Sequence, residues 1–145
     1  MKALTLFCVA GVAIAIGFAN TGVRQPPPET LESLKTKQAQ IKEVIAESMP
    51  ATVAVADGVG SGSGVIVSED GLILTAAHVT QSAGKELVVV FHDGRKVKAK
   101  PRGANRNRDA GLVQITEEGK YPFMEMGRSV SLKDNQWCVS MGHPG

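Results

Sequence analysis

The sequence predicts an all-β fold in which short strands form a small barrel or sandwich. From Ala51 onward, short apolar segments rich in Val, Ile and Ala recur along the chain, and turn residues such as Asp70-Gly71 and Asp93-Gly94 separate them. This regular spacing is typical of antiparallel strands. The composition agrees, because 43% of the 145 residues are hydrophobic and only 4% are aromatic. We therefore expect a core built mainly from Val, Ile, Leu and Ala.

The first 19 residues have the pattern of a secretory signal peptide. Lys2 supplies a positive charge, residues 3–18 carry no charge, and Gly17-Phe18-Ala19 offers small residues for cleavage. The alternative is an uncleaved membrane anchor, but the 16 uncharged residues fall short of the roughly 20 that cross a bilayer. We expect an exported chain, periplasmic or secreted, that contacts a membrane only if this segment is retained.

Residues 20–48 are predicted to form a spacer followed by one amphipathic helix. Pro26-Pro27-Pro28 indicates a stiff, extended segment. Thr30 can cap a helix that begins at Leu31, and the proline of Met49-Pro50 ends it. Apolar residues recur at helical spacing in between, namely Leu31, Leu34, Ile41, Val44 and Ile45. We expect this helix to pack on the following domain or to link it to the membrane side.

Six strands are predicted in the region that follows, and six could close a small barrel. They cover residues 52–56, 64–67, 72–75, 86–92, 96–100 and 110–115. The run Val88-Val89-Val90 indicates burial on both faces of its strand. A seventh strand is predicted over residues 137–141. It would have no partner in this chain, so the sequence resembles an unfinished domain.

The charge pattern argues against a nucleic acid partner. The formal net charge is only +2, and the basic stretch from Arg95 to Arg108 has no aromatic residue that could stack on bases. Lys96, Lys98 and Lys100 alternate along one strand, which predicts a solvated face that also protects a strand edge. His92, His143 and Cys138 do not form a metal-binding pattern, so neither a metal nor a cofactor is predicted. We expect Cys138 to be a small buried residue.

His78 and Asp109 are the candidate catalytic residues. His78 follows the apolar strand 72–75 and two alanines, and its side chain can accept and return a proton near neutral pH. Asp109 directly precedes the strand 110–115. A carboxylate in that position could accept the Nδ1 proton of a catalytic histidine and fix its tautomer.

The setting of these two residues resembles that of trypsin-like serine proteases, in particular the HtrA-like branch. The run from Gly60 to Val79, GSGSGVIVSEDGLILTAAHV, is similar to the strand, turn and histidine segment of that branch. Residues 107–115, NRDAGLVQI, are similar to its aspartate segment, and residues 140–145 resemble a glycine-proline turn early in its second barrel. The resemblance covers residues 49–145 and implies a chymotrypsin-type, six-stranded N-terminal barrel with the second barrel largely absent.

The resemblance implies a serine endopeptidase with a His–Asp–Ser triad, in which His78 is the general base and Asp109 orients it. The family places its nucleophile in a G-x-S-G-G-like turn, and these 145 residues contain no such turn. Ser129, Ser131 and Ser140 do not lie in glycine turns either. We therefore expect a fragment that is inactive alone and would cleave polypeptides if a second barrel completed it. The alternatives are a non-catalytic barrel that serves as a binding module and a membrane-tethered structural protein.

Overall fold

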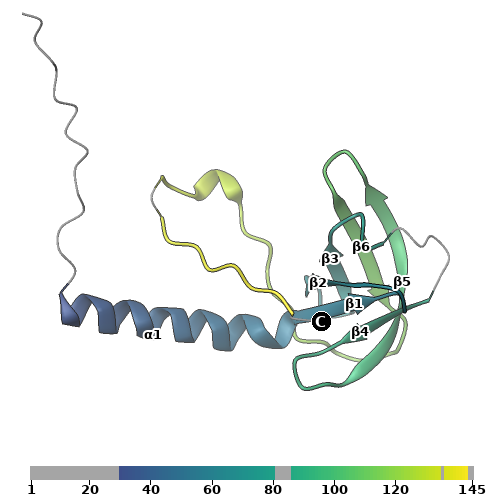
Figure 1. Cartoon of the computed structure of the whole chain (residues 1–145), viewed down its shortest axis with the longest axis horizontal. Helices are drawn as coiled ribbons and strands as arrows, with labels where there is room; N and C mark the ends of the chain where they lie inside the picture. Colours follow the sequence, from purple (N-terminus) through teal and green to yellow (C-terminus); the bar gives the residue numbers. More distant parts are fainter. Residues whose placement is uncertain (1–29, 81–85, 135, 144–145) are drawn as a thin grey trace, which may run out of the picture.

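The computed structural model contains a closed barrel of six antiparallel strands, which confirms the predicted all-β fold. The structure describes residues 30–80, 86–134 and 136–143. The predicted signal peptide, residues 1–19, and the spacer up to residue 29 lie outside the described residues. The strands are β1 (Thr52–Ala56), β2 (Ser61–Ile66), β3 (Leu72–Thr75), β4 (Leu87–Val90), β5 (Lys96–Asn105) and β6 (Ala110–Ile115). Their order around the barrel is β1-β2-β3-β6-β5-β4 (Figure 1).

The barrel core is aliphatic, as the composition predicts. Side chains that point inward alternate along each strand, because successive residues of a strand face opposite sides. Phe91 and Tyr121 supply the aromatic part of the described core, with ring centroids 6.0 Å apart. The remaining buried members are small or branched residues: Ala51, Val53, Val55, Ile66, Ile73, Leu87, Val89, Val97, Ala99, Val113 and Ile115.

The prediction that β4 is buried on both faces is wrong. Leu87 and Val89 are fully buried, whereas the side chain between them, Val88, is 39% exposed. The alternation arises because only the inner face of the barrel is packed, and no described element covers Val88 from outside. The valine run predicts a strand correctly, but it does not show whether one or both faces of that strand are buried.

The predicted seventh strand is also wrong, and the reason is the closure of the barrel. Residues 136–143 are extended but pair with no strand in the described part of the chain. Every strand already has two neighbours, so the barrel has no free edge for another strand. For the same reason Lys96, Lys98 and Lys100 do not protect an edge, because β5 lies between β4 and β6.

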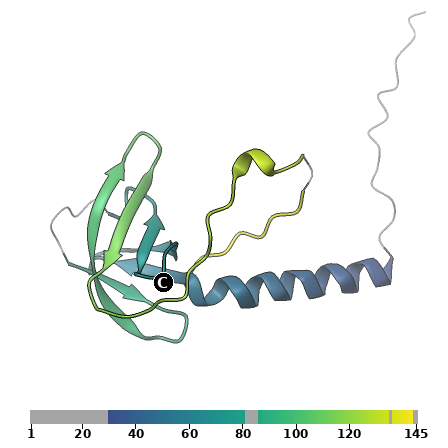
Figure 2. The ribbon, with the colours of Figure 1, turned by 180° about the vertical axis from the view of Figure 1, so that it is seen from behind.

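The predicted helix is present as α1 (Leu31–Ser48), followed by the 3-10 turn η1 (Met49–Ala51). The Thr30 side chain caps it by accepting a hydrogen bond from the Ser33 N–H at 3.2 Å. The expected packing of α1 on the barrel is not found, since none of its residues is buried and it extends away from the barrel (Figures 1 and 2). In the described ranges, no helix is both long and apolar enough to cross a membrane.

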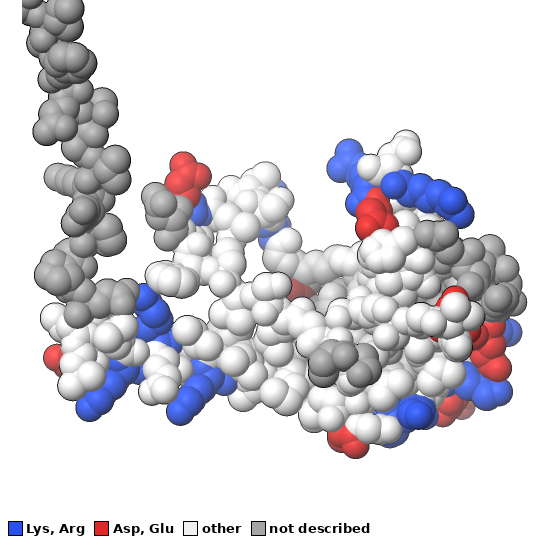
Figure 3. Space-filling model, in the orientation of Figure 1, with Lys and Arg blue, Asp and Glu red and all other residues white. Residues whose placement is uncertain are grey.

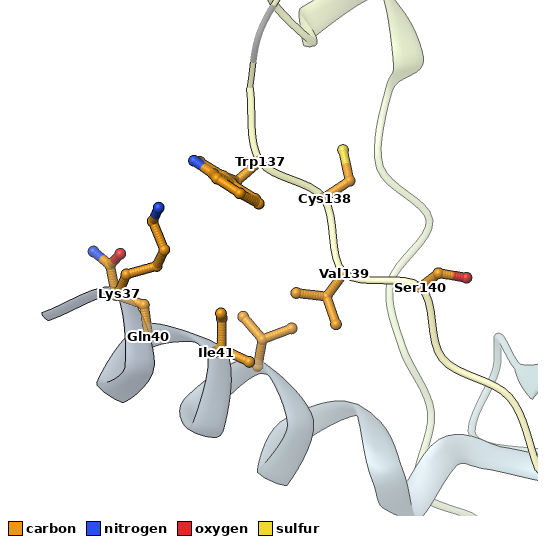
Figure 4. Close-up of a pocket in the computed structure, with 8 residues that line it drawn as sticks. Lys37, Gln40, Ile41, Trp137, Cys138, Val139 and Ser140 are labelled. Atoms are coloured by element: carbon orange, nitrogen blue, oxygen red, sulfur yellow. The ribbon is translucent and has the colours of Figure 1, made fainter. Parts of the chain in front are cut away.

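The chain returns along α1 after the short 3-10 turn η2 (Ser129–Ser131). Trp137 and Val139 face Lys37 and Ile41 across a cavity (Figure 4), and the Lys37 ammonium lies 4.1 Å from the centre of the Trp137 ring. Cys138 is exposed in this segment, so the expectation that it is buried is wrong. Without strand pairing, the segment has too few neighbours to bury the thiol.

Candidate active site

His78 lies in a tight turn that directly follows β3. Two backbone hydrogen bonds close this turn, from Val79 N–H to Ala76 O at 3.2 Å and from Thr80 N–H to Ala77 O at 3.1 Å. Ala77 and Thr80 are buried, and the Thr80 hydroxyl also donates to Ala77 O at 2.9 Å. Buried neighbours on both sides therefore fix the backbone while the His78 side chain remains 64% exposed.

Asp109 lies in the turn of the β5–β6 hairpin, which faces the His78 turn. Its φ angle is 47°, in the left-handed region that aspartate tolerates better than most residues. Its N–H donates to Arg106 O at 3.3 Å, which closes the turn. This conformation brings the carboxylate of Asp109 against the His78 turn, although the two residues are 31 positions apart in the sequence.

The structure brings the two predicted residues together through contacts to both the backbone and the ring of His78. The ring Nδ1 lies 2.8 Å from Asp109 Oδ2 and 3.1 Å from Oδ1. The His78 backbone N–H also donates to Oδ1 at 3.1 Å. A carboxylate can only accept, so Nδ1 must carry the proton, and a neutral ring then has an unprotonated Nε2 that can accept one.

The electrostatics of the pair favour an ionised Asp109. The pKa of Asp109 is lowered from its usual 3.8, first because the His78 backbone N–H donates to the carboxylate and second because the His78 ring does so. The carboxylate is therefore ionised at neutral pH and can stabilise an imidazolium formed on His78.

Gly111 and Thr80, which the sequence patterns do not single out, allow the close approach of the Asp109 and His78 turns. A Cβ atom on Gly111 would lie 2.8 Å from the Thr80 side chain and 3.0 Å from Ala76 O. Only glycine therefore lets the start of β6 approach the His78 turn so closely. The sequence signal was present, since Gly111 follows Asp109 by two positions, but the partner turn could not be identified without the fold.

A shallow cavity of about 290 Å³ opens beside His78 and is lined by the β1–β2 loop and by Val79. The loop is folded by Asp57, whose Oδ1 accepts hydrogen bonds from the N–H groups of Val59 at 3.0 Å and Gly60 at 2.9 Å. A substrate group could reach the exposed His78 ring from this side.

No serine hydroxyl hydrogen-bonds to His78 among the residues that the structure describes. Ser61 lines the cavity beside the ring, and no hydrogen bond joins it to His78. The Ser63 hydroxyl instead accepts from the His143 N–H at 3.0 Å and donates to His143 O at 3.3 Å. Ser140 lies in the cavity beside α1 (Figure 4). The described residues therefore contain a histidine–aspartate pair without a bonded nucleophile.

The other histidines lie apart from this pair. His92 and His143 line a separate cavity together with Met49, Thr52, Met141 and Gly142. No group of three His, Cys, Asp or Glu side chains that could hold a metal ion is found in the described ranges.

Comparison with known proteins assigns this chain to a family. The profile of the family described as "Trypsin-like peptidase domain" matches residues 62–145, a span that begins inside β2 and contains β3 through β6 and both His78 and Asp109. It therefore covers more than half of the chain.

The similar proteins are serine proteases. The chain is 41% identical over 83 residues to the "Probable periplasmic serine endoprotease DegP-like" of Chlamydia trachomatis, covering 57% of this chain and 16% of that protein. It is 42% identical over 84 residues to "Serine protease HTRA1" of Xenopus laevis, covering 58% and 18%. It is 34% identical over 127 residues to "Serine protease HTRA1B" of Danio rerio, covering 80% and 26%. The chain thus spans between a sixth and about a quarter of the length of these three relatives. It belongs to the trypsin-like peptidase family and is similar to the HtrA-like serine proteases within it.

Proposed function

We propose that the barrel supplies the proton-transfer half of a serine endopeptidase site, with His78 as the general base and Asp109 as the acid that orients it. One observation carries the proposal: the Asp109 carboxylate makes two kinds of hydrogen bond to His78. The ring Nδ1 lies 2.8 Å from Oδ2, and the backbone N–H donates to Oδ1 at 3.1 Å. The backbone contact holds the carboxylate and the ring contact holds Nδ1–H, so Nε2 points in one direction and the neutral ring has one tautomer.

The chemistry requires a nucleophile from outside the 145 residues, because their sequence contains no G-x-S-G-G-like turn. His78 Nε2 would take the proton of a serine hydroxyl as its oxygen attacks the peptide carbonyl. The proton would then pass to the leaving amine as the C–N bond breaks and the acyl-enzyme forms. Water would release the acyl group by the same transfer in reverse order.

The substrate proposed is a polypeptide, and the place of action proposed is outside the cytoplasm. The relative from Chlamydia trachomatis is named a periplasmic endoprotease, and the uncharged segment at residues 3–18 follows a positive Lys2 as in exported proteins. Residues 1–145 alone are proposed to be inactive, since a triad that lacks its nucleophile loses several orders of magnitude in rate.

A chimera tests the roles of His78 and Asp109. Residues 49–145 would replace the matching barrel of the Chlamydia trachomatis relative, whose remaining chain supplies the rest of the enzyme. We expect casein cleavage by the chimera, and a loss of at least about 10³-fold in kcat/KM for H78A and for D109N.

The control is H92N, because His92 lies in the separate cavity, and its activity should stay within about twofold. An active chimera that keeps its activity in H78A would overturn the proposed roles. A folded chimera without activity, judged by an unchanged circular dichroism spectrum, would instead favour a barrel that has lost catalysis.

A further inference from the structure

The β5–β6 hairpin carries a concentrated band of positive charge, which we call the basic ribbon. Residues 95–108 contain seven basic side chains and no acidic one, out of 16 Lys and Arg in the whole chain. These are Arg95, Lys96, Lys98, Lys100, Arg102, Arg106 and Arg108, and all of them are exposed. Figure 3 shows Lys and Arg side chains at the projecting end of this hairpin.

The fold leaves most of this charge without an internal role. Lys98 pairs with Glu86 at 3.2 Å, and Arg95 stacks on the Phe91 ring at 4.2 Å. Arg102 shares a cavity with Asp70, Glu117 and Glu118. Lys96, Lys100, Arg106 and Arg108 have no ion pair with any described residue. Protection of a strand edge does not explain them either, because β5 has neighbours on both sides.

The spacing of the lysines fits an extended polypeptide. Lys96, Lys98 and Lys100 alternate with the buried Val97 and Ala99, so the three point outward from one face of β5. A strand rises about 3.3 Å per residue, so neighbouring lysines of this row are about 6.6 Å apart. Alternate side chains of an extended peptide have the same spacing.

The ribbon also leads to the candidate active site. Beyond β5 the chain enters the turn that contains Arg106 and Arg108 and ends with Asp109, the partner of His78. A segment bound along the lysine row and the turn arginines would therefore be held beside the His78–Asp109 pair.

We infer that the basic ribbon binds an extended acidic segment of a polypeptide, with carboxylates at alternate positions along the lysine row. A nucleic acid is the less suitable partner, because residues 95–108 include no aromatic side chain on which bases could stack. The binding is independent of catalysis, and only its use in presenting a substrate rests on the proposed function. The expected partner is an acidic, unfolded stretch of a substrate protein.

Fluorescence anisotropy on the full 145-residue chain tests this inference. The probe is a fluorescein-labelled peptide of about 12 residues in which Glu and Thr alternate, long enough to follow the ribbon. It should bind at about 50 mM salt and weaken strongly at about 300 mM, where charges are screened. K96Q/K100Q/R106Q should raise its Kd by about tenfold, since each exposed charge pair contributes modestly.

Matched controls separate the ribbon from overall charge. K35Q/K42Q/K133Q removes the same charge from exposed residues away from the ribbon and should change the Kd by less than twofold. The charge-retaining variant K96R/K100R/R106K should bind like the original chain, and circular dichroism checks that each variant is folded.

Three results would overturn the inference. They are a Kd for a Lys–Thr peptide equal to that for the Glu–Thr peptide, an equal loss in both charge-removing variants, and tighter binding of a thymidine oligonucleotide of the same length. The last would make the ribbon a nucleic acid surface. A peptide with its Glu residues in one block should bind more weakly than the alternating one, and equal affinity would contradict the proposed match to the lysine row. Loss of peptide binding with an active chimera would leave the roles of His78 and Asp109 standing.

Discussion

Asp109 accepts hydrogen bonds from two different parts of His78, and only one of them is a side chain. The backbone N–H is the larger cause of the lowered Asp109 pKa, and the ring is the second. A substitution of His78 removes the ring but keeps the N–H. The two contributions can therefore be separated by experiment.

We expect the Asp109 carboxyl to titrate below 3.8, to rise partway in H78A and to be unchanged in the control H92A. Because the folded pKa is depressed, the contact stabilises the two turns above pH 3.8 and that contribution is lost as pH falls through the folded pKa. The carbon-13 shift of the Asp109 carboxyl, followed by NMR against pH, gives both midpoints. A return of H78A to the ordinary value would show that the backbone bond has no effect.

Gly111 controls the approach of the two turns. In G111A the new Cβ would lie 2.8 Å from the Thr80 side chain and 3.0 Å from Ala76 O, so the His78 turn must shift. We expect a loss of about 1–3 kcal/mol in the free energy of unfolding, as for overpacking elsewhere, measured by urea denaturation.

The matched control for this prediction is G103A, in the same hairpin, where an added Cβ would meet nothing within 4 Å. Its stability should change by less than about 0.5 kcal/mol. Equal losses in the two variants would mean that hairpin propensity, and not the contact with Thr80, is responsible.

The contact between His78 and Asp109 could be predicted from sequence, because each residue follows or precedes a recognisable strand within a familiar local pattern. Thr80 and Gly111 could not. Their role depends on a contact between turns 31 positions apart. A glycine in a sequence does not show which neighbouring atoms would exclude a larger side chain.

At the scale of elements, α1 and the barrel share little packing. No residue of α1 is buried, so its stability depends on its own hydrogen bonds and cap more than on tertiary contacts. The strands differ, because each is held by two neighbours around a closed barrel. The two parts are therefore expected to respond separately to substitution.

T30A removes the cap that holds the Ser33 N–H, and such losses cost about 1 kcal/mol. We expect weaker helical circular dichroism at an unchanged urea midpoint of the barrel, followed by Phe91 and Tyr121 near-ultraviolet signals. T36A is the control, because the Thr36 hydroxyl donates to Glu32 O within the helix and does not cap its end. A barrel midpoint that falls with T30A would show coupling that the contacts do not suggest.

The strand predictions are confirmed where inward and outward residues alternate. They are wrong where strand pairing depends on whether the barrel is closed. The ranges 52–56, 72–75 and 110–115 are found as predicted. β5 continues to Asn105, past the predicted end at Lys100, because its pairing with β6 persists through an irregularity between Pro101 and Gly103. Residues 137–141 have the composition of a strand, but pairing needs a free edge, and edges are a property of the whole sheet.

For the molecule as a whole, the strands of the barrel are fully paired, whereas the His78–Asp109 pair is open to solvent. Its six strands are all paired and its core is closed. The His78 and Asp109 side chains, in contrast, are 64% and 55% exposed to solvent, whereas proton transfer in proteases takes place in a site shielded from water. No serine is hydrogen-bonded to His78 in the described residues, so the proposed general base has no hydroxyl to activate among them.

A serine-directed fluorophosphonate probe should therefore fail to label the purified 145-residue chain, because labelling needs a hydroxyl whose proton His78 can take. Gel fluorescence is the measurement, with the active chimera as the positive control and its H78A variant as the control for dependence on the base. Labelling of the 145-residue chain that disappears in H78A would identify a serine within these residues as the nucleophile. Ser61 would then be the first to substitute, because it lines the cavity beside His78. Labelling that persists in H78A would indicate reaction elsewhere and would leave the pair without a partner, as the geometry predicts.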